Sequence, residues 1–184
     1  MKILNHAPII QGDTVLLRQP IDRDVDDYLQ VETHPELVRM YGGTPSDIQP
    51  KTRERTLKFV EAIRKNKLEW CVEYNGRFVG QARLMMNEYD NRARYAISLF
   101  DPSVWNQGLG TEITQLVLTY AFHELKLHRI DLRVLAYNKR AIACYQKCGF
   151  VQEGVEREGA LINGVYETDI IMSILDREFT DLLL

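Results

Sequence analysis

The segment from Pro102 to Glu112 constrains the fold more than any other part of the chain. It joins a run of strand type that ends at Phe100 to a helical pattern that begins near Thr111, and Gly108 and Gly110 stand at this junction. Glycine lets the backbone approach a ligand closely, and the first turn of a helix presents unpaired N–H groups at the positive end of its dipole. The junction therefore predicts a backbone site for a phosphate or pyrophosphate, although a loop that only turns the chain would use the same glycines.

Two common nucleotide motifs do not fit this junction. A P-loop needs a lysine followed by serine or threonine after its last glycine, and that pair is absent. The dinucleotide fingerprint needs a third glycine, and Ile113 occupies that position. We therefore do not expect an ATP or NAD site of the usual kinds.

The hydrophobic pattern predicts an α/β chain with a mixed sheet. Short apolar runs bounded by turn residues, such as Asn75-Gly76, indicate strands, and apolar residues at three- and four-residue spacing indicate helices. The predicted strands span residues 15–18, 70–74, 78–86, 95–100, 130–135, 150–155 and 166–175, and the predicted helices span about 24–32, 52–64, 111–125 and 141–148.

Composition limits the functional classes. The chain has 184 residues, 45% of them hydrophobic and 27% charged, which is typical of one globular domain over residues 1–184. Its net charge of −3 offers no broad cationic surface, so we expect neither nucleic acid nor a membrane as a partner. The N-terminal residues lack the pattern of a secretion signal and no run approaches 18 apolar residues, so we expect a cytoplasmic location.

Three cysteines are too few for a disulfide framework. Cys144 and Cys148 stand four residues apart, but no histidine or further cysteine lies at the spacing of a zinc site. We expect reduced thiols and no metal. No histidine stands near these cysteines in the sequence to activate a thiol, so a cysteine nucleophile is not expected either.

A second segment of chemical interest runs from Asn138 to Phe150. Asn138 is placed to cap the helix that follows, and this role alone would account for it. Tyr145 lies seven residues later, two helical turns on, and so shares a face with Asn138. A tyrosine in this position is either a buried ring with a satisfied hydroxyl or a group that acts on a ligand.

Together, the segments 105–111, 131–135 and 138–150 resemble the GNAT N-acetyltransferases, in the branch of the ribosomal-protein alanine acetyltransferases and the spermidine acetyltransferases. The resemblance covers a core of about residues 14–175. It implies a GNAT-like single domain with a mixed, mostly antiparallel seven-stranded sheet flanked by about four helices. It also implies that the strands at 95–100 and 130–135 part from each other and that acetyl-CoA lies in the gap.

The resemblance also implies roles for individual residues. The pantetheine arm would pair with the backbone of Ser98, Leu99 and Phe100. Asn138 would touch the cofactor, and Tyr145 would lie near the thioester sulfur as the general acid. The family motif opens with arginine or glutamine, where this chain has Trp105. The pyrophosphate would lie on the backbone N–H groups of Gln107, Gly108, Leu109, Gly110 and Thr111.

The implied function is transfer of an acetyl group from acetyl-CoA to a primary amine by direct attack in a ternary complex. The amine would belong to a protein N-terminus, a polyamine or another small molecule, and a homodimer is compatible with this interpretation. In many members of the family, a glutamate near the start of the strand before the glycine loop, or on the preceding strand, is the candidate general base. The corresponding places in this chain hold Arg94 and Arg83, so the general base is unassigned. Glu73, Glu88 or a chain of water molecules remain open for this role. The alternative is a non-catalytic CoA-binding sensor or partner module.

Acceptor specificity has no motif that can be read. We expect it to come from the first two helices, the turn at 42–50 and the connection at 158–167, because loops of this kind usually carry specificity. The aspartates at positions 22, 24, 26 and 27 could attract a polyamine, but the preference of a helix N-terminus for negative charge explains them better. The acyl chain length is also left open.

Overall fold

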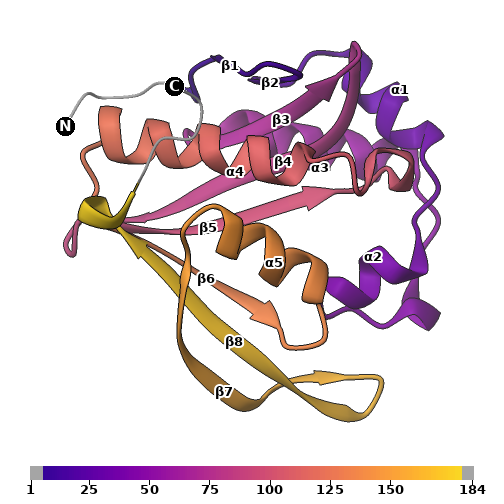
Figure 1. Ribbon diagram of the computed structural model, residues 1–184. Helices are drawn as coiled ribbons and strands as arrows, with labels where there is room; N and C mark the ends of the chain where they lie inside the picture. The colour runs from indigo at the N-terminus through magenta and orange to yellow at the C-terminus, as the bar shows by residue number, and fades with distance from the viewer. Residues whose placement is uncertain (1–5, 180–184) are drawn as a thin grey trace.

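The computed structural model describes residues 6–179 and contains an eight-stranded mixed sheet in the order β1-β2-β3-β4-β5-β6-β8-β7 (Figure 1). The strands are β1 (Ile10–Gln11), β2 (Val15–Arg18), β3 (Glu69–Tyr74), β4 (Arg77–Asn87), β5 (Arg92–Leu99), β6 (Arg129–Leu135), β7 (Val151–Ile162) and β8 (Val165–Leu175). The helices are α1 (Arg23–Gln30), α2 (Pro35–Met40), α3 (Arg53–Lys65), α4 (Leu109–Thr119), which a π-helical turn (Tyr120–Glu124) continues, and α5 (Lys139–Lys147). Short 3₁₀ turns lie at Pro45–Asp47, Pro102–Val104 and Asp176–Glu178.

The predicted α/β fold is confirmed, with three differences in its elements. The two-residue strand β1 is an eighth strand, too short to show an alternating pattern. Helix α2 is a fifth helix of six residues, started by Pro35 at its first turn and by the His34 side chain, which accepts from Glu36 N–H. Strand β7 was expected to end at 155 but continues to Ile162, because irregular pairing between Glu156 and Ala160 keeps it on β8.

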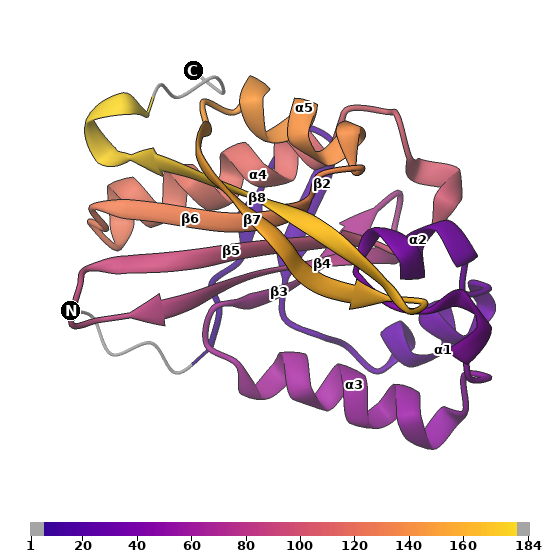
Figure 2. The ribbon, with the colours of Figure 1, turned by 90° about the horizontal axis from the view of Figure 1, so that it is seen from below.

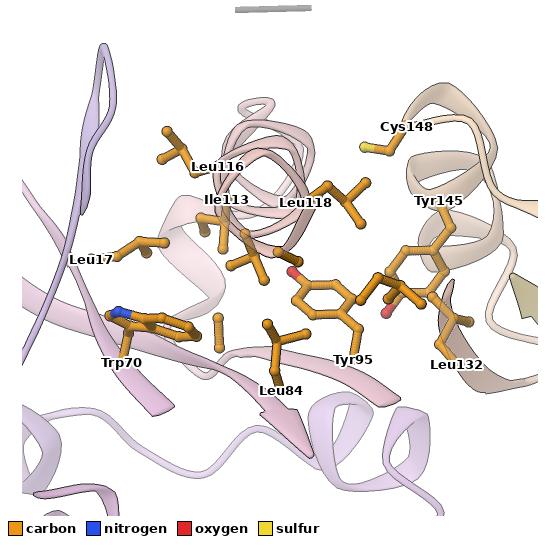
Figure 3. Packing of buried hydrophobic residues seen from close by; sticks show 14 of the residues in the cluster. Leu17, Trp70, Leu84, Tyr95, Ile113, Leu116, Leu118, Leu132, Tyr145 and Cys148 are labelled. Atoms are coloured by element: carbon orange, nitrogen blue, oxygen red, sulfur yellow. The ribbon is translucent and has the colours of Figure 1, made fainter. Parts of the chain in front are cut away.

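Helices cover both faces of the sheet. Figure 2 shows α4 and α5 on one face and α1 and α3 on the other. On the first face, α4 packs Ile113 and Leu118 against Trp70 and Leu84, all nearly inaccessible to water (Figure 3). On the other face, Phe78 and Phe100 pack against Tyr28 of α1 and Phe59 of α3. Each fully buried side chain of this size contributes about 1.5–3 kcal/mol, so the two layers fix the sheet between them.

Strands β5 and β6 are parallel and part soon after they begin. They pair only at Arg92 with Arg129, Ala93 with Ile130 and Arg94 with Asp131. Beyond these positions, β5 continues its antiparallel pairing with β4 and β6 continues with β8. The predicted parting of the two central strands is therefore confirmed, and one backbone edge of each strand faces the gap.

No helix within residues 6–179 is long and apolar enough to cross a membrane. The expectation that the N-terminus carries no secretion signal concerns residues 1–10, and the first five of these lie outside the described part of the chain.

Candidate active site at the parting of two strands

A cleft of about 760 Å³ opens where β5 and β6 part. Its walls come from α2, β4, β5, the loop before α4, β6, α5 and β8. Of the residues predicted from sequence, Ser98, Phe100 and Gln107 are not in its lining, and those that line it are Leu99, Gly108, Leu109, Gly110, Thr111, Asn138 and Tyr145. The fold thus brings the two sequence segments of chemical interest to one cavity.

The N-terminus of α4 forms one end of the cleft. Gly108 is its N-cap in the left-handed conformation, with φ of 84°, and Asn106 before it has φ of 61°. A Cβ on Gly108 would meet no atom within 4 Å, so open space adjoins this backbone. No protein group within residues 6–179 accepts from the N–H groups of residues 106–110, whereas the N–H of Thr111 donates to Gly108 O at 3.0 Å. Adjacent free N–H groups at a helix start suit an anion.

Trp105 connects this loop to β5. Its indole Nε1 donates to Leu99 O at 2.8 Å, and its ring lies between the His34 ring, 5.3 Å away edge-on, and the Arg140 guanidinium, 4.3 Å away. Arg140 also approaches Glu36 of α2 at 3.7 Å. The tryptophan that replaces the motif's usual arginine or glutamine therefore ties the loop, α2 and α5 together.

The Gln107 side chain also forms hydrogen bonds that fix it within the loop. Its Nε2 donates to Ser103 O at 2.7 Å, and its Oε1 accepts from the Tyr74 hydroxyl at 3.2 Å. These two bonds hold the residue next to Gly108 in a fixed position without using its backbone N–H.

The register of β5 decides which of its backbone groups reach the gap. The N–H of Phe100 donates to Val79 O of β4 at 3.1 Å, and Ser98 pairs with Gln81 of the same strand. Because the backbone groups of a strand point alternately to its two neighbours, Ile97 and Leu99 face the gap instead. The expected backbone pairing through Ser98 and Phe100 is therefore corrected to Ile97 and the N–H of Leu99, whose carbonyl Trp105 occupies.

Asn138 caps the N-terminus of α5, as predicted from the sequence. Its Oδ1 accepts from Ala141 N–H at 3.2 Å. The same side chain lines the cleft, and within the described residues its Nδ2 has no protein acceptor. The two roles are compatible because the cap uses only the oxygen.

Tyr145 extends from α5 toward the gap between β5 and β6. Figure 3 shows its hydroxyl between Tyr95 and Leu132, and the Tyr95 ring lies edge-on at 6.3 Å. The residue is 8% exposed and lines the cleft. Burial raises the pKa of Tyr145 well above its usual range, so the hydroxyl keeps its proton near neutral pH.

Cys144 lines the cleft beside the α4 N-terminus, which sequence reasoning had not assigned to the site. Its Sγ lies 3.6 Å from Thr111 Oγ1, and Cys148 Sγ lies 3.7 Å from Thr111 O. The neighbouring Cys148 thiol lowers the pKa of Cys144, with a smaller contribution from Thr111. Within residues 6–179 no three histidine, cysteine or acidic side chains gather as metal ligands, and the expectation of no metal stays a prediction.

The far end of the cleft lies on the α3 face of the sheet and contains two residues that carried no motif. Arg83 of β4 and Tyr41, which follows α2, both line it. Tyr41 is 54% exposed, and burial of its ring raises the pKa of the hydroxyl against the charge of Arg83. Ser98 lies outside the lining, and its backbone pairs with Gln81 of β4.

The residues considered as general base lie elsewhere. Glu73 accepts from Arg18 Nε at 2.6 Å, and neither Glu73 nor Glu88 lines the cleft. Arg94, at one of the two positions where the resemblance implies a glutamate, pairs with Asp131 at 2.8 Å. The one carboxylate in the lining is Asp169, whose Oδ2 accepts from Arg133 at 3.0 Å.

Comparison with known proteins places this geometry in a family. The model of an acetyltransferase (GNAT) domain matches residues 14–151. The chain is 26% identical to the spermidine N(1)-acetyltransferase of Escherichia coli (strain K12) over 163 residues, which is 88% of this chain and 86% of that protein. It is 44% identical to the probable N-acetyltransferase YjcK of Bacillus subtilis (strain 168) over 70 residues, which is 38% of this chain and 39% of that protein.

Solved structures show the same fold. The crystal structure of spermidine N-acetyltransferase from Vibrio cholerae in complex with CoA and spermine superposes with a TM-score of 0.74 at 23% identity, covering 91% of this chain and 98% of that chain.

Proposed function

This chain belongs to the GNAT family of acetyltransferases, and from that premise we propose that it moves an acetyl group from acetyl-CoA directly to a primary amine. The two substrates would meet where β5 and β6 part, because the cleft passes from the α4 N-terminus through the gap to Arg83 on the α3 face. The name of the spermidine relative supports an amine acceptor.

The cleft fits acetyl-CoA at the end formed by α4. A pyrophosphate would lie on the free N–H groups of residues 106–110, beside the open space at Gly108. The Ile97 backbone and the Leu99 N–H would pair with the pantetheine arm and hold it extended along β5. Asn138 Nδ2 would donate to the same arm from α5. Acetyl-CoA supplies the activated acetyl group, and this chain supplies its position.

The groups around the gap suit the two charges that acyl transfer generates. The Ile97 N–H would stabilise negative charge that develops on the carbonyl oxygen, while the Ile97 carbonyl and the Leu99 N–H hold the arm. The Tyr145 hydroxyl would hold a proton for the departing sulfur, because burial keeps that hydroxyl neutral and the gap leaves it without a protein partner in residues 6–179. The direct route needs no covalent enzyme intermediate.

The observation that carries this proposal is the position of Tyr145 at the gap, opposite the unpaired edge of β5. Tyr145→Phe removes only the hydroxyl, so we expect kcat to fall about 10²- to 10⁴-fold while acetyl-CoA affinity changes little. Release of free thiol with a panel of primary amines measures the rate, and calorimetry measures acetyl-CoA binding.

The same measurements test the alternative. Equal losses of rate and affinity in Tyr145→Phe would make Tyr145 a binding residue, and an unchanged kcat would remove it from the mechanism. Tight CoA binding without thiol release for any amine would instead support a CoA-binding module that does not turn over.

A further inference from the structure

We propose that the acceptor is a free α-amino acid with an apolar side chain, whose carboxylate binds Arg83. This inference rests on the proposed acetyl transfer and names the substrate class of the same cleft. It departs from the polyamine that the name of the spermidine relative would suggest, and three features of the acceptor end support it: its charge balance, a cation without a partner, and its apolar wall.

The charges in the cleft lining do not suit a polyamine. The lining contains four cationic side chains and one carboxylate. That carboxylate, Asp169, is 13% exposed and is already bonded to Arg133, which also pairs with Glu156. A polyamine carries several ammonium groups, and each would have to leave water without a free carboxylate among these lining residues.

Arg83 is the cation at the acceptor end that has no partner. No carboxylate oxygen within the described residues lies within 4.0 Å of its guanidinium, whereas Arg133 pairs with Asp169 and Arg140 approaches Glu36. Glu69 stands opposite it in the β3–β4 pairing, but Glu69 lies outside the cleft lining and accepts from Asn66 Nδ2 at 3.0 Å. A half-buried arginine that faces a cavity is suited to bidentate binding of a carboxylate.

One hydroxyl group accompanies this guanidinium. Tyr41 lines the same end of the cleft, and burial raises the pKa of its hydroxyl while the charge of Arg83 lowers it by a smaller amount. Arg83 and Tyr41 therefore place a cation and a hydroxyl donor at this end of the cleft. Donors of this kind match the oxygens of one carboxylate better than they match an ammonium group, which has no lone pair to accept them.

The remaining wall is apolar. Leu37 and Met40 of α2, Ile97 of β5 and Leu135 of β6 line the cleft around the gap. A hydrophobic substituent would gain about 25 cal/mol for each Å² that it buries there. An α-amino acid places its amine, its carboxylate and such a side chain on one carbon, so all three would be bound together.

The test compares amines that differ only in the carboxylate. Acetyl-CoA and the purified protein are supplied with L-leucine or 3-methylbutylamine, with L-phenylalanine or phenethylamine, and with spermidine, and thiol release is followed. We expect kcat/KM for each amino acid to exceed that of its matched amine and of spermidine at least tenfold. Equal or greater activity with the matched amines or with spermidine would overturn the proposal.

Arg83→Gln tests the residue itself. We expect kcat/KM for L-leucine to fall at least tenfold in this variant, while the value for 3-methylbutylamine and the KM for acetyl-CoA stay within about twofold. Arg55→Gln, on the exposed face of α3, removes the same charge away from the cleft and should change neither. A parallel loss for both amines in Arg83→Gln would show a structural role instead.

Product binding separates this inference from the proposed function. Calorimetry with N-acetyl-L-leucine needs no turnover, and we expect tighter binding to the wild type than to Arg83→Gln. If the product binds in this way but no amine is acetylated, acetyl transfer is wrong and the carboxylate site stands as a binding site. If amines are acetylated but the product binds both proteins equally, the assignment of Arg83 is wrong.

Discussion

At the scale of single residues, Cys144 shows how a side chain with no expected role becomes part of the site. It is the only one of the three cysteines that is not buried, and it lines the cleft next to the backbone of Gly110. Cys148 is buried beside it, and the interaction of the two thiols lowers the pKa of Cys144 and raises that of Cys148, so the thiolate forms on Cys144. Burial likewise raises the pKa of Cys71.

These positions predict selective alkylation. We expect iodoacetamide to modify Cys144 first, at a rate that rises with pH as its thiolate forms, since its pKa is lowered. Saturating acetyl-CoA should slow the reaction at least fivefold because it would cover this wall of the cleft. Peptide mass spectrometry at several pH values identifies the modified residue.

Cys144→Ser and Cys71→Ser are the matched variants for this experiment. The first should abolish the fast reaction and the second should leave it unchanged, because Cys71 is 0% exposed. Fast modification that acetyl-CoA does not slow would place Cys144 outside the donor end of the cleft.

At the scale of elements, the start of α4 carries the donor site. Gly108 has a left-handed backbone, which costs an L-residue roughly 1–2 kcal/mol, and its missing side chain leaves the cradle open. We expect Gly108→Val to weaken acetyl-CoA binding at least tenfold, as measured by calorimetry. Circular dichroism should show an intact fold.

A second variant, at Gly110, and a control variant, at Gly154, accompany that experiment. A Cβ on Gly110 would lie 3.4 Å from Cys144 Sγ, so the branched side chain of Gly110→Val would press on α5 as well as on the ligand, and we expect a loss of binding there too. Gly154→Ala, on β7, has open space and should bind acetyl-CoA like the wild type. Unchanged binding in both loop variants would place the pyrophosphate elsewhere.

The elements also show what could be predicted from the sequence. The strand, glycine loop and helix around Gly108 follow from local patterns, because turn chemistry and apolar spacing are properties of neighbouring residues. The direction in which the backbone N–H and C=O of Ser98 point does not follow from such patterns. It depends on the pairing of β5 with β4, and a shift of one residue in that pairing would turn these groups toward the gap. Helix α2 was missed because six residues are too few to show a period.

Two residues of the site were not predicted from the sequence for the same reason. Tyr41 follows a short helix and belongs to no motif, and Arg83 was noticed only as the residue in a place where relatives have glutamate. Their shared position at one end of the cleft is created by pairing between strands and by the loop after α2. Strand pairing and the path of this loop depend on residues far apart in the sequence, so no local pattern predicts that Tyr41 and Arg83 lie together.

At the scale of the whole molecule, a ligand in the gap would replace the missing contacts between the two parts of the sheet. Binding only to the folded state stabilises it by about 2.7 kcal/mol at a concentration 100 times Kd. For a chain of this length, about 2–4 °C per kcal/mol gives a rise in Tm of roughly 5–10 °C. Differential scanning fluorimetry with CoA measures it.

Gly108→Val is the control for this measurement, because the shift should shrink in proportion to its lost affinity. An unchanged Tm in the wild type, at a concentration shown by calorimetry to saturate the protein, would contradict binding to the native cleft.

The brief pairing of β5 with β6 also determines where the molecule is stiff. Three paired positions and the contact of Arg94 with the buried Asp131 carboxylate join the two strands at one end of the gap, while Leu99 and Leu135 lie at the other end, where no pairing joins β5 to β6. A small rotation of one strand relative to the other would barely change their spacing near Ala93 but would change it most at Leu99. We therefore expect the width of the opening to vary more toward Leu99 and Leu135 than near the paired positions.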